Sequence, residues 1–147
     1  MKTLINGNWV SRSVEEKTVD GSFKRHKTAF RNWITRDGSA GPSGKGGFKA
    51  ESKRYHLYVS LACPWAHRTL IIRLLKGLSE HVGVSIVHPL MKENGWELVN
   101  DYPSTTGDPI LGKSAIYEIY LKANPFVTSR ASVPVLCDNK HDTIVSN

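Results

Sequence analysis

The chain has 147 residues, of which 39% are hydrophobic, enough for the core of one ordinary globular domain. Its formal charge is +7, from 20 lysines and arginines against 13 acidic residues. This composition excludes a fibrous or disordered chain, and no apolar run reaches the roughly 18 residues of a membrane helix. We therefore expect a globular protein of the cytoplasm that does not bind membranes.

The positive charge is concentrated in the first third of the chain. Residues 1–54 hold 12 basic and 5 acidic side chains, whereas residues 55–147 hold 8 of each. Aromatic residues lie among the basic ones: Phe23, Phe30, Trp33 and Phe48. Nucleic-acid-binding segments share this pattern, but no recognition motif accompanies it here. We predict a solvated basic arm that packs a few aromatic side chains onto the domain and binds no nucleic acid.

A glycine-rich stretch follows the arm. Residues 38–47 read Gly-Ser-Ala-Gly-Pro-Ser-Gly-Lys-Gly-Gly, a composition that breaks both helices and strands. A phosphate-binding loop would need glycine where Ser39 stands and a hydroxyl where Gly46 stands. The stretch is therefore predicted to be a boundary loop. Residues 1–54 then form a basic N-terminal extension that includes this loop, and residues 55–147 form one domain.

The pattern after the boundary predicts a strand, a helix and a second strand. Between residues 55 and 61 apolar residues alternate with His56, Tyr58 and Ser60, which is the period of a strand. Pro64 suits the first position of a helix. Apolar residues recur along that helix at the spacing of one face: Leu70, Ile71, Leu74, Leu75 and Leu78. The opposite face would carry the basic residues: Arg68, Arg73 and Lys76. The second strand covers 82–87.

The rest of the chain predicts a loop, a short helix and a hairpin. The stretch 91–112 is polar and contains glycines, which is typical of a loop. Apolar residues between 115 and 121 indicate a short helix, ended by an Asn-Pro pair. Two β-branched runs, 133–136 and 143–145, flank a polar turn and predict a hairpin. The predicted fold class is α/β, with a small mixed sheet of four strands.

Cys63 is the residue best placed for chemistry. It lies at the turn from the first strand into the first helix, where unpaired backbone N–H groups and the helix dipole favour a thiolate. Ala66 stands where a dithiol motif has its second cysteine, so Cys63 can form a disulfide only with an external thiol. A buried cysteine that only packs is the alternative. For Cys137, inside an apolar strand, packing is the favoured interpretation.

Two further features bear on ligand binding. Two cysteines are too few for a disulfide framework or a zinc site, and Cys63 with His67 lacks a second pair of residues at ligand spacing. We expect free thiols and no metal. Pro134 enters a strand directly after Val133, which makes this bond a candidate for a cis peptide that turns the Val133 backbone toward a ligand. An ordinary trans proline is the alternative.

Several segments together resemble one family, the glutathionyl-hydroquinone reductases, or Xi class of the glutathione transferases. The longest is Arg54-Tyr-His-Leu-Tyr-Val-Ser-Leu-Ala-Cys-Pro-Trp-Ala-His-Arg-Thr-Leu. Shorter ones follow it: His88-Pro-Leu-Met, Glu93-Asn-Gly-Trp, Gly107-Asp, Val133-Pro-Val and Thr143-Ile-Val-Ser-Asn. The resemblance covers the whole chain and extends into the arm, at Ala29-Phe-Arg-Asn-Trp and Gly41-Pro-Ser-Gly.

The resemblance implies a thioredoxin-like fold, the glutathione-binding N-terminal domain of glutathione transferases, with Cys63 as the catalytic thiol. Trp96 would form an aromatic wall against glutathione, and Arg130 would contact it through its positive charge. Val133, with Pro134 cis, would bind the cysteinyl unit through its backbone. Without the resemblance, the alternatives are that Trp96 is a core residue and Arg130 a solvated loop charge. The sequence departs from the family at position 137, where a tryptophan is expected.

The reaction that the resemblance implies is reductive, with glutathione as co-substrate and glutathionylated quinone-type small molecules as partners. The family continues into a final helix and an all-helical C-terminal domain, which this sequence does not contain, and the full-length protein is expected to be a homodimer. Apolar faces of the sheet and the first helix would then be open. The residues leave two alternatives, a glutaredoxin-like thioltransferase or dehydroascorbate reductase, and a truncated chain that binds glutathione or a partner protein without catalysis.

Overall fold

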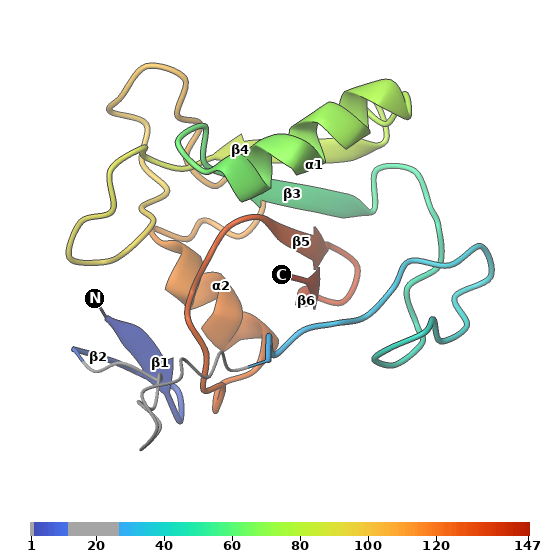
Figure 1. Ribbon diagram of the computed structural model, residues 1–147, viewed down its shortest axis with the longest axis horizontal. Coiled ribbons are helices and arrows are strands. Elements are labelled where there is room, and N and C mark those ends of the chain that lie inside the picture. Colours follow the sequence, from blue (N-terminus) through green and yellow to red (C-terminus); the bar gives the residue numbers. More distant parts are fainter. Residues whose placement is uncertain (1, 12–26) are drawn as a thin grey trace, which may run out of the picture.

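The computed structural model describes residues 2–11 and 27–147. Within them a four-stranded sheet lies between two helices, α1 on one face and α2 on the other (Figure 1). A two-stranded hairpin near the N-terminus lies beside α2. Phe23, which the sequence placed in the basic arm, lies outside the described residues. The described part of the chain has no helix that is both long and apolar enough to cross a membrane.

The main sheet is mixed. Its strands are β3 (Tyr55–Val59), β4 (Val82–Ile86), β5 (Val135–Asp138) and β6 (Thr143–Ser146), and they lie in the order β4-β3-β5-β6. β3 pairs with β4 in parallel and with β5 antiparallel, and β5 and β6 form an antiparallel hairpin. The four-stranded mixed sheet predicted from the sequence is confirmed.

Both predicted helices are also present. α1 (Pro64–Leu75) has Pro64 in its first turn, where its missing N–H group is not needed, and α2 (Ile116–Ala123) ends before Asn124. The stretch predicted as a loop, 91–112, contains no helix or strand and connects β4 to α2. The parallel pairing of β3 and β4 requires a crossover connection, which α1 supplies.

The strand predicted between residues 55 and 61 is present as β3, although it ends at Val59, and both of its faces are buried. Leu57 and Val59 pack against Ala66 of α1 on one face. Tyr58 is fully buried on the other face, in the core formed with α2, and its hydroxyl donates a hydrogen bond to Asp108 Oδ1 at 2.9 Å. A central strand covered by a helix on each face has no solvent side, so its polar residues need internal partners.

The face of α1 that meets the sheet also differs from the prediction. Ala66 is fully buried, Leu70 packs beside it, and Arg73 turns toward the sheet, with Nε donating to the Val82 carbonyl at 2.7 Å. These positions share one helix face, and the small Ala66 lets the helix approach β3 closely. Five large apolar side chains of α1 are exposed instead: Trp65, Ile71, Ile72, Leu74 and Leu75. The prediction that α1 carries an open apolar face is therefore confirmed.

The N-terminal segments pack onto the domain rather than away from it. A hairpin that the sequence analysis missed, β1 (Thr3–Ile5) and β2 (Asn8–Val10), pairs with itself in antiparallel fashion. Further along, Phe30 packs against the α2-side core, and Phe48 is buried with Tyr55 and Val145. Short hydrophobic segments that pack on a distant part of the chain carry little local signal of their own.

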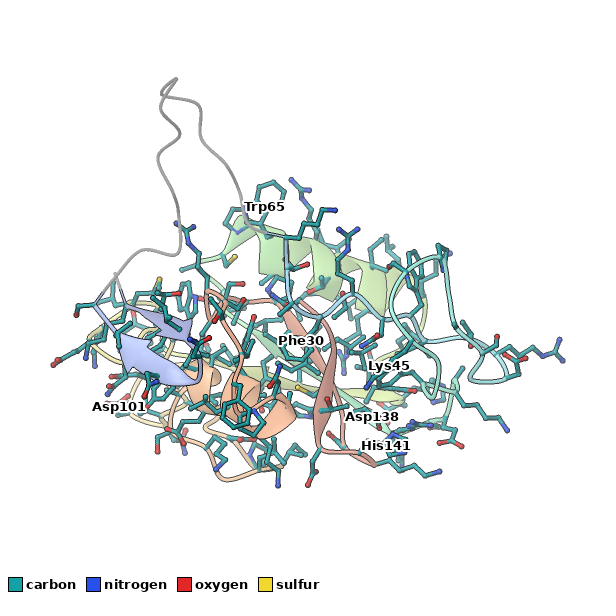
Figure 2. The ribbon with its side chains drawn as sticks, turned by 90° about the horizontal axis from the view of Figure 1, so that it is seen from below. Phe30, Lys45, Trp65, Asp101, Asp138 and His141 are labelled. Atoms are coloured by element: carbon teal, nitrogen blue, oxygen red, sulfur yellow. The ribbon has the colours of Figure 1, made fainter. Side chains whose placement is uncertain are left out.

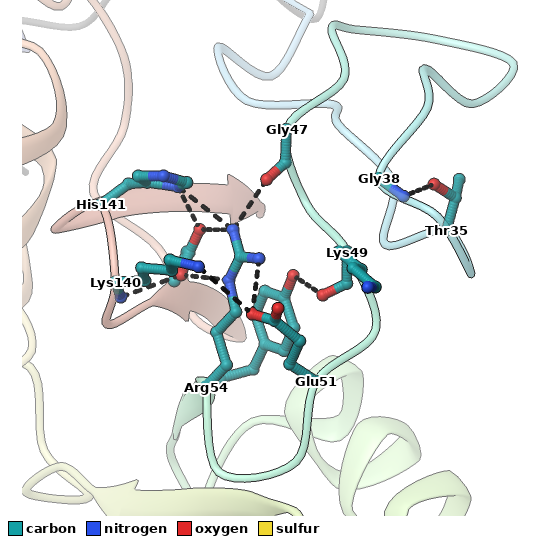
Figure 3. A network of polar contacts seen from close by, with 10 residues as sticks. Thr35, Gly38, Gly47, Lys49, Glu51, Arg54, Lys140 and His141 are labelled. Atoms are coloured by element: carbon teal, nitrogen blue, oxygen red, sulfur yellow. Dashed lines mark hydrogen bonds and ion pairs between the residues drawn. The ribbon is translucent and has the colours of Figure 1, made fainter.

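A buried ion pair ties the start of β3 to the end of β5 (Figure 3). The guanidinium of Arg54 donates from Nε to Asp138 Oδ1 at 2.9 Å and from Nη2 to Oδ2 at 2.6 Å. Its Nη1 donates to Glu51 at 2.9 Å, and Nη2 also reaches the Gly47 carbonyl at 2.7 Å. His141 Nδ1 lies 2.8 Å from Asp138 Oδ2. The network fixes the glycine-rich boundary loop to the β5–β6 hairpin.

Candidate active site

Cys63 forms the N-terminal boundary of α1. Its backbone is extended, its N–H group donates to the Ser60 carbonyl at 3.2 Å, and its own carbonyl accepts the first helical bond from His67 at 3.0 Å. The side chain is half-buried and makes no capping hydrogen bond to the first turn. The sulfur therefore sits where the sequence predicted it, at the end of a helix whose first N–H groups lack intrahelical partners.

The fold brings Cys63 to the segment that enters β5. Its Sγ lies 3.6 Å from the carbonyl oxygen of Val133, a residue 70 positions away in the sequence. The Val133–Pro134 peptide bond is cis, which confirms that prediction. Val133 is buried and Pro134 half-buried, so the thiol faces a fixed stretch of backbone. Two of the residues singled out from the sequence thus meet in one place.

The second cysteine has a different environment. Cys137 lies in β5 and is buried in the core on the α2 side of the sheet. Burial, with the carboxylates of Asp108 and Asp138 nearby, raises the pKa of its thiol. A thiol held neutral is a poor nucleophile, so the packing role predicted for Cys137 is confirmed. Ala66, one turn after Cys63, is fully buried and leaves Cys63 without a neighbouring thiol in its helix.

Trp96 and Arg130 lie on the segments that lead into α2 and β5. The Trp96 ring is half-buried against the α2-side core, the same core that Cys63 contacts, and its carbonyl accepts from the Ile116 N–H at 2.9 Å. The Arg130 side chain is exposed and follows Ser129, whose backbone pairs with Leu4. The start of α2 thus fixes Trp96, while Arg130 borders the N-terminal hairpin. Their contacts with glutathione stay predictions.

An aromatic residue beside the thiol was not singled out from the sequence. Trp65, two positions after Cys63, is 55% exposed and projects outward from α1 (Figure 2). The guanidinium carbon of Arg68 lies 4.2 Å from the centre of its ring, a cation–π contact. In the sequence, only its position directly after Cys63-Pro64 pointed to this residue. That position does not indicate whether the ring is exposed or packed in the core.

An apolar groove runs along the α1 side of the sheet. It has a volume of about 420 Å³, and its walls include Leu57 and Leu136 from the sheet, Ile72 from α1, and Pro134 beside the thiol. The prediction that the sheet, like α1, leaves an apolar face open is wrong, because both faces of β3 are buried and none of the exposed large apolar side chains of the described residues lies on a strand. The groove and the exposed face of α1 lie next to each other, since Ile72 belongs to both.

A mixed four-stranded sheet between two helices, with one cysteine at the first helix and a cis-proline facing it, defines a thioredoxin-like domain of the glutathione transferase type. The comparisons agree with this class. The chain is 54% identical over all 147 residues to glutathionyl-hydroquinone reductase YqjG of Escherichia coli. It is 37% identical, again over its whole length, to glutathionyl-hydroquinone reductase PcpF of Sphingobium chlorophenolicum. No protein-family model matches the chain.

Solved structures lead to the same class. The glutathione-bound structure of the Escherichia coli protein superimposes with a TM-score of 0.84 at 51% identity, covering 99% of this chain and 41% of that one. An Xi-class transferase of Natrialba magadii superimposes with a TM-score of 0.83 at 41% identity over the whole of this chain. This protein is a homologue of the Xi-class glutathione transferases and has their thioredoxin-like domain. The chain spans 45% and 44% of the lengths of the two curated relatives above.

Proposed function

We propose that this chain is the glutathione-binding part of a glutathione-dependent reductase that acts on glutathionyl-hydroquinones. The observation that carries the proposal is the single thiol of Cys63 at the start of α1, 3.6 Å from the Val133 carbonyl beside a cis-proline. Two relatives that align over the whole chain are named glutathionyl-hydroquinone reductases. One of them has been solved with glutathione bound.

The proposed reaction uses Cys63 as a nucleophile. Its thiolate attacks the sulfur of a glutathionyl-hydroquinone, an S–S bond forms, the carbon–sulfur bond breaks, and the aromatic carbon takes up a proton. This step releases hydroquinone and leaves glutathione joined to Cys63 as a mixed disulfide. A second glutathione thiolate then attacks that disulfide, which releases glutathione disulfide and restores the Cys63 thiolate. The hydroquinone carbon is reduced, and two glutathione sulfurs are oxidised.

The residues proposed to hold glutathione match its chemistry. Glutathione is an extended, anionic tripeptide, which an exposed guanidinium, a backbone edge and an aromatic surface can each recognise. We assign the guanidinium to Arg130, the backbone contact to Val133 with cis Pro134, and the aromatic surface to Trp96. All three segments adjoin the α2 face of the domain or the entry to β5, where Cys63 also lies.

The whole protein is proposed to have further parts and partners. We assign residues 1–54 to an N-terminal extension and 55–147 to the thioredoxin-like domain, and we place the protein in the cytoplasm as a homodimer. Both cysteines are free thiols, which suits a reducing compartment. The relatives are about twice as long as this chain, and we expect their additional part to cover the exposed apolar face of α1, where Leu75 is 75% exposed.

The thiol alone does not select the acceptor. A glutaredoxin-like thioltransferase or a dehydroascorbate reductase would form the same mixed disulfide on Cys63, and a chain that only binds glutathione would release no hydroquinone. The three possibilities therefore differ in which acceptor is turned over, and a direct comparison of acceptors separates them.

The test supplies glutathionyl-hydroquinone, dehydroascorbate or a glutathionylated peptide together with glutathione, to residues 1–147 and to the whole protein. Mass analysis detects the Cys63 adduct, and chromatography detects hydroquinone and glutathione disulfide. We expect the whole protein to release hydroquinone, and we expect the adduct to form on the whole protein and on residues 1–147. Cys63→Ser should give neither product, and Cys137→Ser should leave the yields of hydroquinone and adduct unchanged. Faster turnover of either other acceptor would replace the proposal, and an adduct on Cys63→Ser would contradict the assignment of the thiol.

A further inference from the structure

The N-terminal hairpin is bonded to the segment that carries Arg130. Leu4 and Ser129 exchange two backbone hydrogen bonds, each 3.0 Å long, and the Thr3 hydroxyl donates to the Ser129 carbonyl at 2.9 Å. Thr3 and Leu4 are both buried. Because Arg130 directly follows Ser129, the hairpin fixes the backbone from which the Arg130 side chain extends.

The same hairpin also contacts the segment that carries Trp96. The Trp9 ring packs on Gly95 so closely that a Cβ atom at this glycine would lie 3.3 Å from the ring. Lys2, directly before β1, adds an ion pair from its Nζ to Glu93 Oε1 at 3.1 Å. Gly95 directly precedes Trp96, so Trp9 supports the backbone from which the Trp96 ring extends.

Packing, rather than polar bonding, holds the Trp9 ring. It stacks on Tyr117 of α2 with ring centres 4.6 Å apart and planes 10° apart. Its Nε1 is buried and has no hydrogen-bond partner among residues 2–11 and 27–147. A cavity of about 210 Å³ lies between Lys2, Trp9 and the turn from Met91 to Gly95, so this turn is not packed on all sides. The contacts of the hairpin therefore add to the bonds that the turn makes between Lys92 and Gly95 and to the bond from the start of α2 to Trp96.

We infer that the β1–β2 hairpin is a positioning element of the glutathione site, which holds Trp96 and Arg130 in the relative arrangement that binds the tripeptide. The inference rests on the proposed function, since it takes these two residues as glutathione contacts. They come from segments far apart in the chain, and the hairpin contacts the residue directly before each of them. Holding two contacts in advance lowers the entropy that binding would otherwise lose. Trp9 and Thr3 act through these residues and touch no substrate.

The experiment measures how the rate of Cys63 adduct formation depends on the concentration of glutathione disulfide, in residues 1–147. Trp9→Leu removes the stacked ring, and we expect the half-saturating concentration to rise about tenfold while the saturated rate stays within about twofold. Trp9→Phe keeps a stacked ring without Nε1 and should restore the wild-type value. Trp33→Leu is the matched control, because Trp33 is 51% exposed and its Nε1 bonds Ser43, away from the hairpin.

Thr3→Val provides a second test that keeps the size and shape of the buried side chain. It removes only the bond to the Ser129 carbonyl, and we expect a rise of about threefold in the half-saturating concentration. In an Arg130→Ala background the same change should have no effect, because the residue through which Thr3 acts is then absent. A general loss of folding would lower the saturated rate in both backgrounds and would contradict a positioning role.

The outcomes separate the two proposals. If the wild-type chain forms no adduct, or if its rate does not saturate with glutathione disulfide, the proposed function is overturned together with this inference. If the wild type saturates but Trp9→Leu and Thr3→Val both behave like Trp33→Leu, the hairpin plays no part in binding and only the inference is overturned.

Discussion

The Arg54–Asp138 ion pair allows a quantitative test of what holds the sheet together. The Asp138 side chain is fully buried and that of Arg54 is 6% exposed. Each oxygen of the carboxylate has two donors: Oδ1 accepts from Arg54 Nε and the Lys140 N–H, and Oδ2 accepts from Arg54 Nη2 and His141. Asp138→Asn keeps the size of the side chain but replaces one acceptor by an NH₂ group that faces donors.

The expected loss of stability follows from this geometry. Removing one partner of a buried ion pair costs about 3–5 kcal/mol, because the remaining charge has left water without compensation. Glu51 stays 2.9 Å from Arg54 Nη1 and compensates part of the charge, although its side chain is partly exposed. We therefore expect a loss at the lower end of the range, about 3 kcal/mol, which corresponds to a shift of about 1.5 M in a urea midpoint.

The assay is urea unfolding of the wild type and two variants, followed by circular dichroism. Asp142→Asn is the matched control: it makes the same chemical change in the same β5–β6 turn, where the Asp142 carboxylate is exposed and pairs only with Lys122 at 3.2 Å among the ion pairs of the described residues. An exposed pair of this kind is worth less than about 1 kcal/mol. Equal midpoints for Asp138→Asn and Asp142→Asn would refute the assigned role of the buried pair.

The same pair predicts a pH dependence. Burial by itself raises the pKa of the Asp138 carboxyl, but hydrogen bonds from Arg54, the Lys140 N–H and His141 outweigh it and hold the pKa below its ordinary value. Because the folded pKa is the lower one, the carboxylate contributes its full stability above the unfolded value of about 3.9. That contribution is lost as the pH falls below this value and through the folded pKa. Asp138→Asn should lack this part of the acid-induced loss.

Two other predictions concern single side chains. Cys137 should resist a thiol reagent such as Ellman's reagent in the folded protein and react on unfolding, since burial raises its pKa; prompt reaction of Cys137 in Cys63→Ser would contradict this. Leu75→Lys should change the urea midpoint little, because Leu75 is 75% exposed, and should reduce self-association of residues 1–147 in sedimentation experiments. A free energy of unfolding lowered by more than about 1 kcal/mol would mean that Leu75 packs in the core.

From residue 55 onward, the sequence by itself determined the order of the elements and the place of the thiol. Short apolar runs predicted the strands, Pro64 predicted the start of α1, and together they placed Cys63 between strand and helix. These signals are local: a backbone conformation depends mainly on the residue itself and its near neighbours. The same reasoning separated Cys137, inside an apolar run, from Cys63, at the end of one.

Only the tertiary structure decided which faces are buried and which distant segments meet. Nearly every position of α1 after Ala66 that could face the sheet is apolar or has a long aliphatic stem, so helical spacing did not identify Ala66, Leu70 and Arg73 as the packed side. The contact between Cys63 and Val133 joins residues 70 positions apart. Leu4 of β1 forms a β-bridge with Ser129, which also lies far from it in the sequence. Contacts between residues so far apart in the sequence depend on how the sheet and the helices pack against one another. The residues next to each partner in the sequence do not determine that packing.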